Sequence, residues 1–320
     1  MIYTERKPQK SVYSDPVSPF IFHTPAVEDF RLFAVERMDR YHFRRDITKK
    51  FTPRQLDPIL DGYKFTNAYR ILDRVTQFEI EHVVDGEFAN EQSHAAAIFI
   101  FRTLNSVETY AAIPAELLYR AFAGRGQIFK HLNEYKSKGN VIFGNAYLMP
   151  SGHTEGYTSR LDFFEAMLEQ LIASGDLIAL YNSLVIEFSF DILRKYKGMG
   201  DFLAYQYALD YSYRHKHVDY DSFIVPGVGC VRGMKKVFPG ITRKEMPAVL
   251  SALTEVGMGP SFRPLEVDGQ VFPLRGNDVQ NLFCEYDKYT RVLRKEGRMK
   301  AHFDHPYRTL PEPVIPRAWR

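Results

Sequence analysis

Two arginines spaced four residues apart could hold an anion in the stretch YKFTNAYRILDRVTQ, residues 63–77. On a helix, the apolar residues of this stretch gather on one side and the polar residues on the other. A solvated face usually favours lysine and glutamate, but this face carries one carboxylate, two guanidinium groups and two amides: Asp73, Arg70, Arg74, Asn67 and Gln77. Guanidinium groups bind carboxylates and phosphates through paired hydrogen bonds. The spacing therefore predicts a helix over 63–77 whose polar face grips an anion.

A second row of polar side chains lies in NDVQNLFCEYDKYTRVL, residues 277–293. On a helix, an acid, an amide, a second acid and a lysine share about a quarter of the wheel; they are Asp278, Asn281, Glu285 and Lys288. One interpretation is a solvated face with a glutamate–lysine pair three residues apart. The alternative is a row that orients an amine and takes its proton. Gln206 and Asp210 share a third helical face.

Two glycine-rich turns, YKGMGDF and VPGVGCVRG, precede helical patterns; their glycines are Gly198, Gly200, Gly227 and Gly229. A dinucleotide-binding fingerprint is disfavoured because Arg232 stands where the third glycine belongs and no βαβ series surrounds it. A helix-hairpin-helix turn would present backbone N–H groups to a DNA phosphate, with Arg232 adding charge and Val228 anchoring the turn in the core. A plain turn between helices is the remaining interpretation.

The elements that must position these residues are mainly helices. Helical periodicity dominates from Val27 onward, and Asp268-Gly269 between alternating apolar residues indicates a β-hairpin. The fold class is therefore mostly α with a minor β-hairpin. We expect an N-terminal tail over 1–26, a helical domain over 27–300 and a C-terminal tail over 301–320. The helical domain could divide into two lobes, about 27–175 and 176–300.

Composition sets broad limits on function. The 320 residues are 45% hydrophobic and 14% aromatic, and the net charge is +3, which permits an anionic partner without requiring one. The aromatic residues suit a core or stacking against bases. Two cysteines are too few for a four-thiolate zinc site, and we expect reduced thiols and no metal site. The sequence shows no signal peptide, membrane span or P-loop, so we expect an intracellular protein, in the host cytoplasm if the source is a virus.

Three stretches in this order carry a family resemblance: YKFTNAYRILDRVTQ, then GMGDFLAYQYALDYSY with VPGVGCVRGMKKVF, then NDVQNLFCEYDKY. Together they resemble the alpha-glutamyl/putrescinyl thymine pyrophosphorylases, also described as amino acid:DNA transferases, over residues 27–298. A similar helical module accompanies the 5-hydroxymethyluracil DNA kinases. The resemblance implies a helix-hairpin-helix DNA-glycosylase-like helical fold. It also implies a transferase that displaces pyrophosphate from 5-(pyrophosphoryloxymethyl)uracil in DNA with the amine of an amino acid or polyamine.

The resemblance gives the polar residues roles. Base flipping would bring the modified uracil into the protein, and a carboxylate would bind and deprotonate the amine. The implied catalytic residues are Asp210, Asp278, Glu285 and Lys288. The implied pyrophosphate- and base-binding residues are Asn67, Arg70, Asp73, Arg74, Gln77, Gln206 and Asn281, with Arg70 and Arg74 as a clamp. The implied DNA-backbone contacts are Gly198, Gly200, Gly227, Gly229 and Arg232.

The implied partners are DNA containing modified uracil, an amino acid or polyamine co-substrate and a 5-hydroxymethyluracil DNA kinase. No cofactor is required by the pattern, although Mg²⁺ could accompany the pyrophosphate. The absence of a P-loop from this sequence favours the transferase over the kinase. A glycosylase-like enzyme that excises a modified base and a non-catalytic DNA-binding module remain as alternatives.

Overall fold

The computed structural model describes residues 23–46, 57–146, 149–296, 302–303 and 309–320. In these ranges the protein is mostly helical with one antiparallel two-stranded sheet, which confirms the predicted class. Within the same ranges, no helix combines the length and the apolar character needed to span a bilayer. The longer α-helices are α1 (Pro25–Arg45), α4 (Glu91–Leu104), α7 (Arg125–Ser137), α8 (Arg160–Ala173), α10 (Ile186–Arg194), α11 (Asp201–Ser212), α12 (Val228–Val237), α13 (Met246–Val256) and α14 (Gly276–Leu293).

The remaining elements are short. The shorter α-helices are α2 (Pro58–Gly62), α3 (Arg74–Glu79), α5 (Val107–Ala111), α6 (Ala115–Tyr119) and α9 (Asp176–Asn182). The 3-10 segments are η2 (Arg70–Leu72), η4 (His153–Glu155) and η5 (Arg317–Trp319), and η3 (Ile80–Val84) is a π-helix. The strands are β1 (Leu265–Val267) and β2 (Gln270–Phe272).

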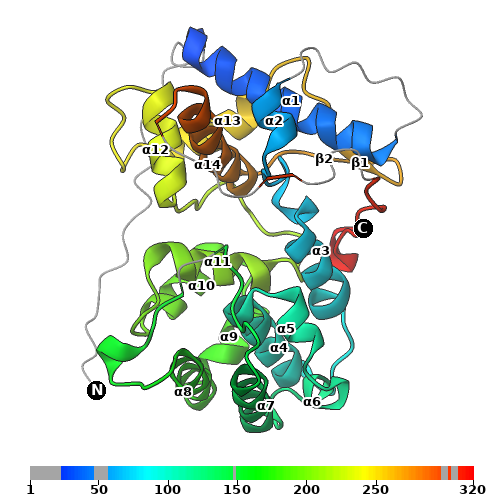
Figure 1. The fold of residues 1–320 in the computed structure, drawn as a ribbon, viewed down its shortest axis with the longest axis vertical. Helices are drawn as coiled ribbons and strands as arrows, with labels where there is room; N and C mark the ends of the chain where they lie inside the picture. The colour runs from blue at the N-terminus through cyan, green and yellow to red at the C-terminus, as the bar shows by residue number, and fades with distance from the viewer. Residues whose placement is uncertain (1–22, 47–56, 147–148, 297–301, 304–308) are drawn as a thin grey trace.

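The helices form two groups in space (Figure 1). One group contains α1, α2, α12, α13, α14 and the hairpin, and the other contains α4 to α11; α3 lies between the groups. The first group joins segments far apart in sequence, because α1 packs on both α12 and α14. In the second group α10 packs on α11 and α7 on α8, and α4 packs on the more distant α9 and α11.

Small residues allow α12 and α14 to approach closely. A Cβ atom added at Gly229 would overlap the thiol of Cys284, and one added at Gly233 would overlap the carbonyl oxygen of Phe283. The Phe283 ring stacks on Phe30 of α1 with 3.9 Å between ring centroids. The glycines therefore fix the seam on which the first group is assembled, and both cysteines are free, as expected from the sequence.

The β-hairpin has the predicted turn. Val267 pairs with Gln270, so Asp268 and Gly269 form the two-residue connection. Both turn residues have positive φ, 51° and 76°, as a type I′ turn requires. An Asp-Gly pair between apolar residues predicts a hairpin because both residues tolerate the positive φ that this turn requires.

The predicted helix over 63–77 is wrong for its first eleven residues, 63–73. The chain is not helical between Lys64 and Ala68, then forms η2, and only becomes α-helical at Arg74. Asp73 accepts a hydrogen bond from the backbone N–H of Asn67 at 3.0 Å, and the Asn67 side chain donates to the Leu72 carbonyl at 2.8 Å. Such side-chain bonds to nearby backbone compete with helix formation.

The glycine seam predicts a stability difference between two Gly→Ala substitutions. Gly233→Ala should lower the free energy of unfolding by about 1–3 kcal/mol, because the new methyl group meets backbone that cannot rotate away. Gly62→Ala is the matched control, since nothing lies within 4 Å of its added Cβ. Urea denaturation would measure both variants. Equal stability of the two would contradict the requirement for a glycine at position 233 between α12 and α14.

Candidate functional site

Two arginines and two carboxyl groups are buried together where η2, α3, α4 and α11 meet. Arg102 is 1% exposed and contacts both oxygens of Asp210, with Nη2 at 2.7 Å from Oδ1. The same Nη2 lies 3.0 Å from Glu79. The Arg70 Nη2 atom lies 3.6 Å from Asp210 Oδ1, and Arg70 Nη1 donates a hydrogen bond to Gln206 Oε1 at 2.5 Å. These contacts join η2, α3, α4 and α11 in one charge network.

The network brings together three predicted site residues but encloses them. Asp210 and Glu79 are fully buried, and burial together with the Asp210 charge raises the pKa of Glu79 to about 8. Arg70 is 8% exposed, and its Nε donates to the hydroxyl of Tyr213 at 3.0 Å. Because Asp210 has no exposed surface, the arrangement suits a support for neighbouring groups better than direct contact with a substrate.

The predicted row on α14 faces protein rather than solvent. The backbone N–H of Arg70 donates to Asp278 at 2.7 Å, and the backbone N–H of Thr66 donates to Glu285 at 3.2 Å. Asn281 donates to the Thr66 hydroxyl at 2.8 Å. The row therefore holds the non-helical segment 64–70 against α14, and the solvated-face interpretation does not describe it.

The far end of this row is partly accessible. Lys288 lies 2.5 Å from Glu285, and its side chain is 37% exposed. The pKa of Lys288 is raised, because the Glu285 carboxylate outweighs the effect of burial, which opposes it. Burial raises the pKa of Asp73 to about 7, and the charges of Glu285 and Lys288 also act on this carboxyl group. Asp73, whose pKa lies near neutral pH, and Lys288 therefore influence each other electrostatically at this end of α14.

Arg70 and Arg74 do not share a face. The Arg74 side chain is 75% exposed and pairs with Glu108 at 3.1 Å, whereas Arg70 is buried in the charge network. The predicted two-arginine clamp required a continuous helix, which the segment does not form. Gln77 instead exchanges hydrogen bonds with the backbone of Val314, with its Oε1 accepting at 2.7 Å and its Nε2 donating at 3.0 Å.

The two glycine turns lie next to each other at helix starts. Gly198 has a φ of +81°, and Gly200 precedes α11. Gly227 precedes α12, and the ring of Phe202 packs where a Cβ of Gly227 would stand. The expectation that Val228 anchors the turn in the core is wrong, because Val228 is 70% exposed. Its exposure leaves the start of α12 open to a partner.

Arg232 belongs to a cluster of cations around a single buried carboxylate. Asp287 is fully buried and pairs with Arg232 at 2.9 Å, Lys236 at 3.0 Å and Arg291 at 3.2 Å. Burial opposes ionisation of Asp287, but the hydrogen bonds and charges of Arg232 and Lys236 lower its pKa. The Arg232 side chain is 50% exposed, so it adds positive charge beside the start of α12.

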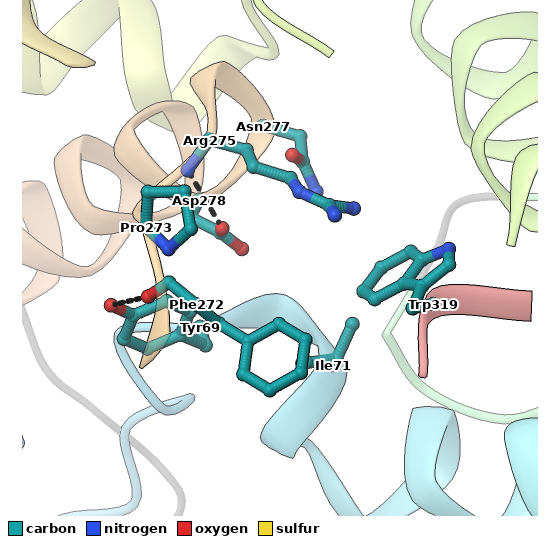
Figure 2. Close-up of a pocket in the computed structure, with 8 residues that line it drawn as sticks. All are labelled: Tyr69, Ile71, Phe272, Pro273, Arg275, Asn277, Asp278 and Trp319. Carbon is teal, nitrogen blue, oxygen red and sulfur yellow. Dashed lines mark hydrogen bonds between the residues drawn. The ribbon is translucent and has the colours of Figure 1, made fainter. Parts of the chain in front are cut away.

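A pocket lies at the N-terminal end of α14 (Figure 2). Its polar side is formed by Arg275, Asn277 and Asp278. Its remaining walls are apolar or aromatic and come from Tyr69, Ile71, Phe272, Pro273 and Trp319. Asp278 accepts backbone N–H bonds from Arg70 at 2.7 Å and Arg275 at 3.0 Å, while burial raises its pKa to about 6. The pocket thus offers a carboxylate that is ionised at neutral pH.

Sequence reasoning missed several of these residues. Arg102 directly follows the apolar run 95–101. A charged residue next to such a run indicates a buried side chain that needs an ionic partner. Asn277 directly precedes Asp278, and Arg275 lies on the other side of Gly276. Polar residues at the start of a helix usually indicate capping rather than a binding site. Trp319 comes from the segment expected to be a tail, yet it is 4% exposed.

Comparison with known proteins agrees with the helical class. The family model described as 5-hmdU DNA kinase, helical domain, matches residues 24–299. A 5-hmdU DNA kinase from Bacillus phage SP10 is 25% identical over 258 residues, covering 70% of this chain and 38% of that protein. The chain thus spans less than half of the length of this relative. No solved structure matches the chain significantly.

The charge network predicts a large difference between two arginine substitutions. Arg102→Met should lower the free energy of unfolding by about 3–5 kcal/mol, because it leaves Asp210 and Glu79 buried without their partner. Arg74→Met removes only a solvent-exposed pair and should cost less than about 1 kcal/mol. Chemical denaturation would compare them, and similar losses would contradict the central role of Arg102.

Asp73 predicts a pH-dependent stability difference. Its pKa is about 7 in the folded protein and about 3.9 when unfolded, so stability falls as pH rises between these values. Asp73→Asn keeps an acceptor for the Asn67 N–H without ionising. The variant should exceed the parent by about 1–2 kcal/mol at pH 8, after allowance for partial exposure, and by less at pH 5. Urea unfolding at both pH values tests this, and a constant difference would contradict it.

Proposed function

Because the chain belongs to the family of the 5-hmdU DNA kinase helical domain, we propose that it modifies 5-hydroxymethyluracil bases in DNA. The proposed reaction is transfer of an amine from an amino acid or polyamine to the pyrophosphorylated base. We assign the amine transfer to this chain because its motif stretches resemble those of the amino acid:DNA transferases. A 5-hydroxymethyluracil DNA kinase is the partner that would supply the substrate.

The proposed step forms one bond and breaks one. The amine nitrogen attacks the exocyclic methylene carbon, a C–N bond forms, and the C–O bond to pyrophosphate breaks. The bonding electrons leave with pyrophosphate, and the extra proton of the amine passes to a carboxylate. The protein therefore has to supply a proton acceptor, positive charge for the leaving group and a site for the base outside the DNA stack.

Asp278 is the proposed proton acceptor. It lines the pocket, and its pKa of about 6 leaves it ionised at neutral pH yet more basic than an ordinary aspartate. Arg70 acts as a positioning residue, because its backbone N–H holds the Asp278 carboxylate while its side chain is fixed by Gln206 and Tyr213. Asp210 supports Arg70 from inside the charge network.

The other end of the α14 row lies about 15 Å from Asp278 along the helix, so the pyrophosphate is proposed to meet Arg275 beside Asp278, and Lys288 a neighbouring DNA phosphate. Lys288 supplies a partly exposed cation beside Glu285, with Asp73 and Asn281 nearby on the same side. Mg²⁺ would enter with the pyrophosphate, since this ion is usually held by one or two carboxylates together with substrate phosphates. Among the described residues, no group of three or more His, Cys, Asp and Glu side chains forms a metal site of its own.

The starts of α11 and α12 are proposed to hold the DNA backbone in a helix-hairpin-helix, glycosylase-like arrangement. Gly200 and Gly227 are the N-cap residues of these helices and have no side chain to cap them, and helix N-termini bind phosphates. Arg232 adds positive charge, and exposed Val228 could pack against a sugar or base. Base flipping would then bring the modified uracil toward the α14 row.

The observation that carries the proposal is the pocket itself. It is a small hollow in which the Asp278 carboxylate and the Arg275 guanidinium group converge beside aromatic rings, and the pKa of this carboxyl group is raised. A glycosylase-like enzyme is the second candidate, because a buried carboxylate in a pocket could activate water in place of an amine. The two candidates differ in product.

The test is the mass of nucleosides released from pyrophosphorylated DNA after incubation with the protein and candidate amines. Transfer gives a heavier nucleoside and free pyrophosphate, whereas a glycosylase gives free base and an abasic site. DNA affinity that falls with salt but yields no product would indicate a binding module.

Asp278→Asn should slow the transfer at least about a hundredfold, because the proton acceptor is lost. Asp268→Asn is the matched control, since Asp268 is exposed in the hairpin turn and asparagine tolerates its positive φ. Full activity of Asp278→Asn in a cooperatively folded protein would rule out the proposed role.

A further inference from the structure

Residues 309–320 form a strap that lies beside α3 and is fastened to the helices by side chains (Figure 1). Residues 309–316 contain no helix or strand, and η5 follows them. Val314 exchanges two hydrogen bonds with the side chain of Gln77, and the backbone N–H of Arg317 donates to the Asp85 carboxylate at 3.0 Å. Segments without regular backbone pairing open at a lower free energy than the core around them. We therefore expect the strap to detach more readily than the helices unfold.

The strap carries one large side chain into the pocket at the start of α14. Trp319 is 4% exposed, and the Cζ atom of Arg275 lies 3.8 Å from a ring centroid of its indole. The rings of Tyr213 and Tyr220 meet the indole edge to face, at 5.7 Å and 5.8 Å between centroids. Figure 2 shows the indole beside the guanidinium end of Arg275. With the indole in place, the hollow beside Asp278 has room for about one water molecule, so Trp319 closes the pocket.

The indole is a poor match for the polar groups that it covers. Arg275 Nη1 and Asn277 Oδ1 are buried and have no hydrogen-bond partner among the described residues. The one donor of the indole, its Nε1–H group, is used on the carbonyl oxygen of His215 at 3.1 Å. Buried polar atoms without a partner destabilise the state that contains them. A flat ring that carries an N–H donor and oxygen acceptors would satisfy both atoms while it stacks on the same guanidinium face.

We infer that the strap is a lid and that Trp319 occupies the place of the everted base until DNA displaces it, an assignment that rests on the proposed function. An indole is larger than a pyrimidine ring, so the space that it vacates admits a uracil. The base would stack on the Arg275 guanidinium group, as bases commonly do on arginine and aromatic side chains. Arg275 Nη1 would gain an oxygen of the base or of its pyrophosphate, and Asn277 Oδ1 would gain the N–H donor. The lid would shield Asp278 from solvent until the substrate arrives.

The first test asks whether the strap opens separately from the fold. Trp319 is the only tryptophan of the chain, so tryptophan fluorescence reports on the strap alone. In urea, we expect the emission maximum and the quenching by acrylamide to change at a lower concentration than the helical circular dichroism, because the strap detaches before the helices unfold. Coincident transitions would place the strap in the cooperative core and would overturn the inference.

The second test measures displacement by the substrate. The probes are two duplex oligonucleotides, one with a pyrophosphorylated 5-hydroxymethyluracil and one with thymine at the same position, and a label on the DNA follows binding independently. We expect the modified duplex to shift the Trp319 emission to longer wavelength and to raise its quenching by acrylamide, and the thymine duplex to do so less. Binding of the modified duplex without a change at Trp319 would overturn the lid alone. Absence of binding would overturn both the lid and the proposed function.

Two variants distinguish a lid from a wall of the binding site. Trp319→Ala should tighten binding of the modified duplex about threefold to tenfold, because the closed state no longer competes with the open one. The same variant would weaken binding if Trp319 were a wall that holds the base, and that result would overturn the inference.

The second variant loosens the strap and leaves its tryptophan in place. Gln77→Ala removes both hydrogen bonds to Val314 without changing a residue that lines the pocket, so it should raise the quenching of Trp319 in the free protein. Gln127→Ala, at an exposed position on α7, is the matched control. Equal quenching in the two variants would contradict a lid held by these bonds, even if Trp319→Ala folds poorly.

The results separate this inference from the proposed function. Displacement of Trp319 by the modified duplex without release of pyrophosphate would refute the proposed reaction and leave the lid intact. Release of pyrophosphate while Trp319 stays protected from acrylamide would support the reaction and overturn the lid.

Discussion

The structure depends on one network of two guanidinium groups and two carboxyl groups that are removed from water. Arg102, Asp210 and Glu79 are almost completely buried, and Arg70 is nearly so. Each ion costs several kcal/mol to desolvate, and this cost is offset only while every partner stays in place. Because the four side chains come from η2, α3, α4 and α11, the requirement fixes these elements relative to one another.

The same requirement reaches the pocket through one residue. Arg70 has its guanidinium in the charge network and its backbone N–H on Asp278. The position of the Asp278 carboxylate is therefore set by contacts on the opposite side of the segment, and not only by α14. An aspartate with no exposed surface, Asp210, thus serves as support, whereas the aspartate that lines the pocket is available for chemistry. The two were indistinguishable as members of polar helical faces.

Local patterns predicted local features well. The Asp-Gly turn gave the hairpin, and the four-residue row on α14 was found on one face. The helix over 63–77 failed because periodicity does not show that Asn67 and Asp73 bond to nearby backbone. Arg275 and Asn277 were missed because their pocket needs Trp319, more than forty residues away. The division into lobes near residue 175 stays a prediction about domains, although contacts between α1 and α14 join distant parts of the chain.

Helix α14 carries both the packing contacts that hold the fold together and the residues proposed to act on a ligand. Its apolar side meets α12 where Gly233 allows backbone contact, so the helix cannot shift without steric overlap. Its polar side holds the segment 64–70 through Asp278, Asn281 and Glu285. A helix that is held on both sides by these contacts positions its N-terminal end precisely enough for side chains there to act on a ligand. Two buried polar atoms without a hydrogen-bond partner, Arg275 Nη1 and Asn277 Oδ1, lie at that end beside the pocket, and the close packing against α12 lies further along the helix.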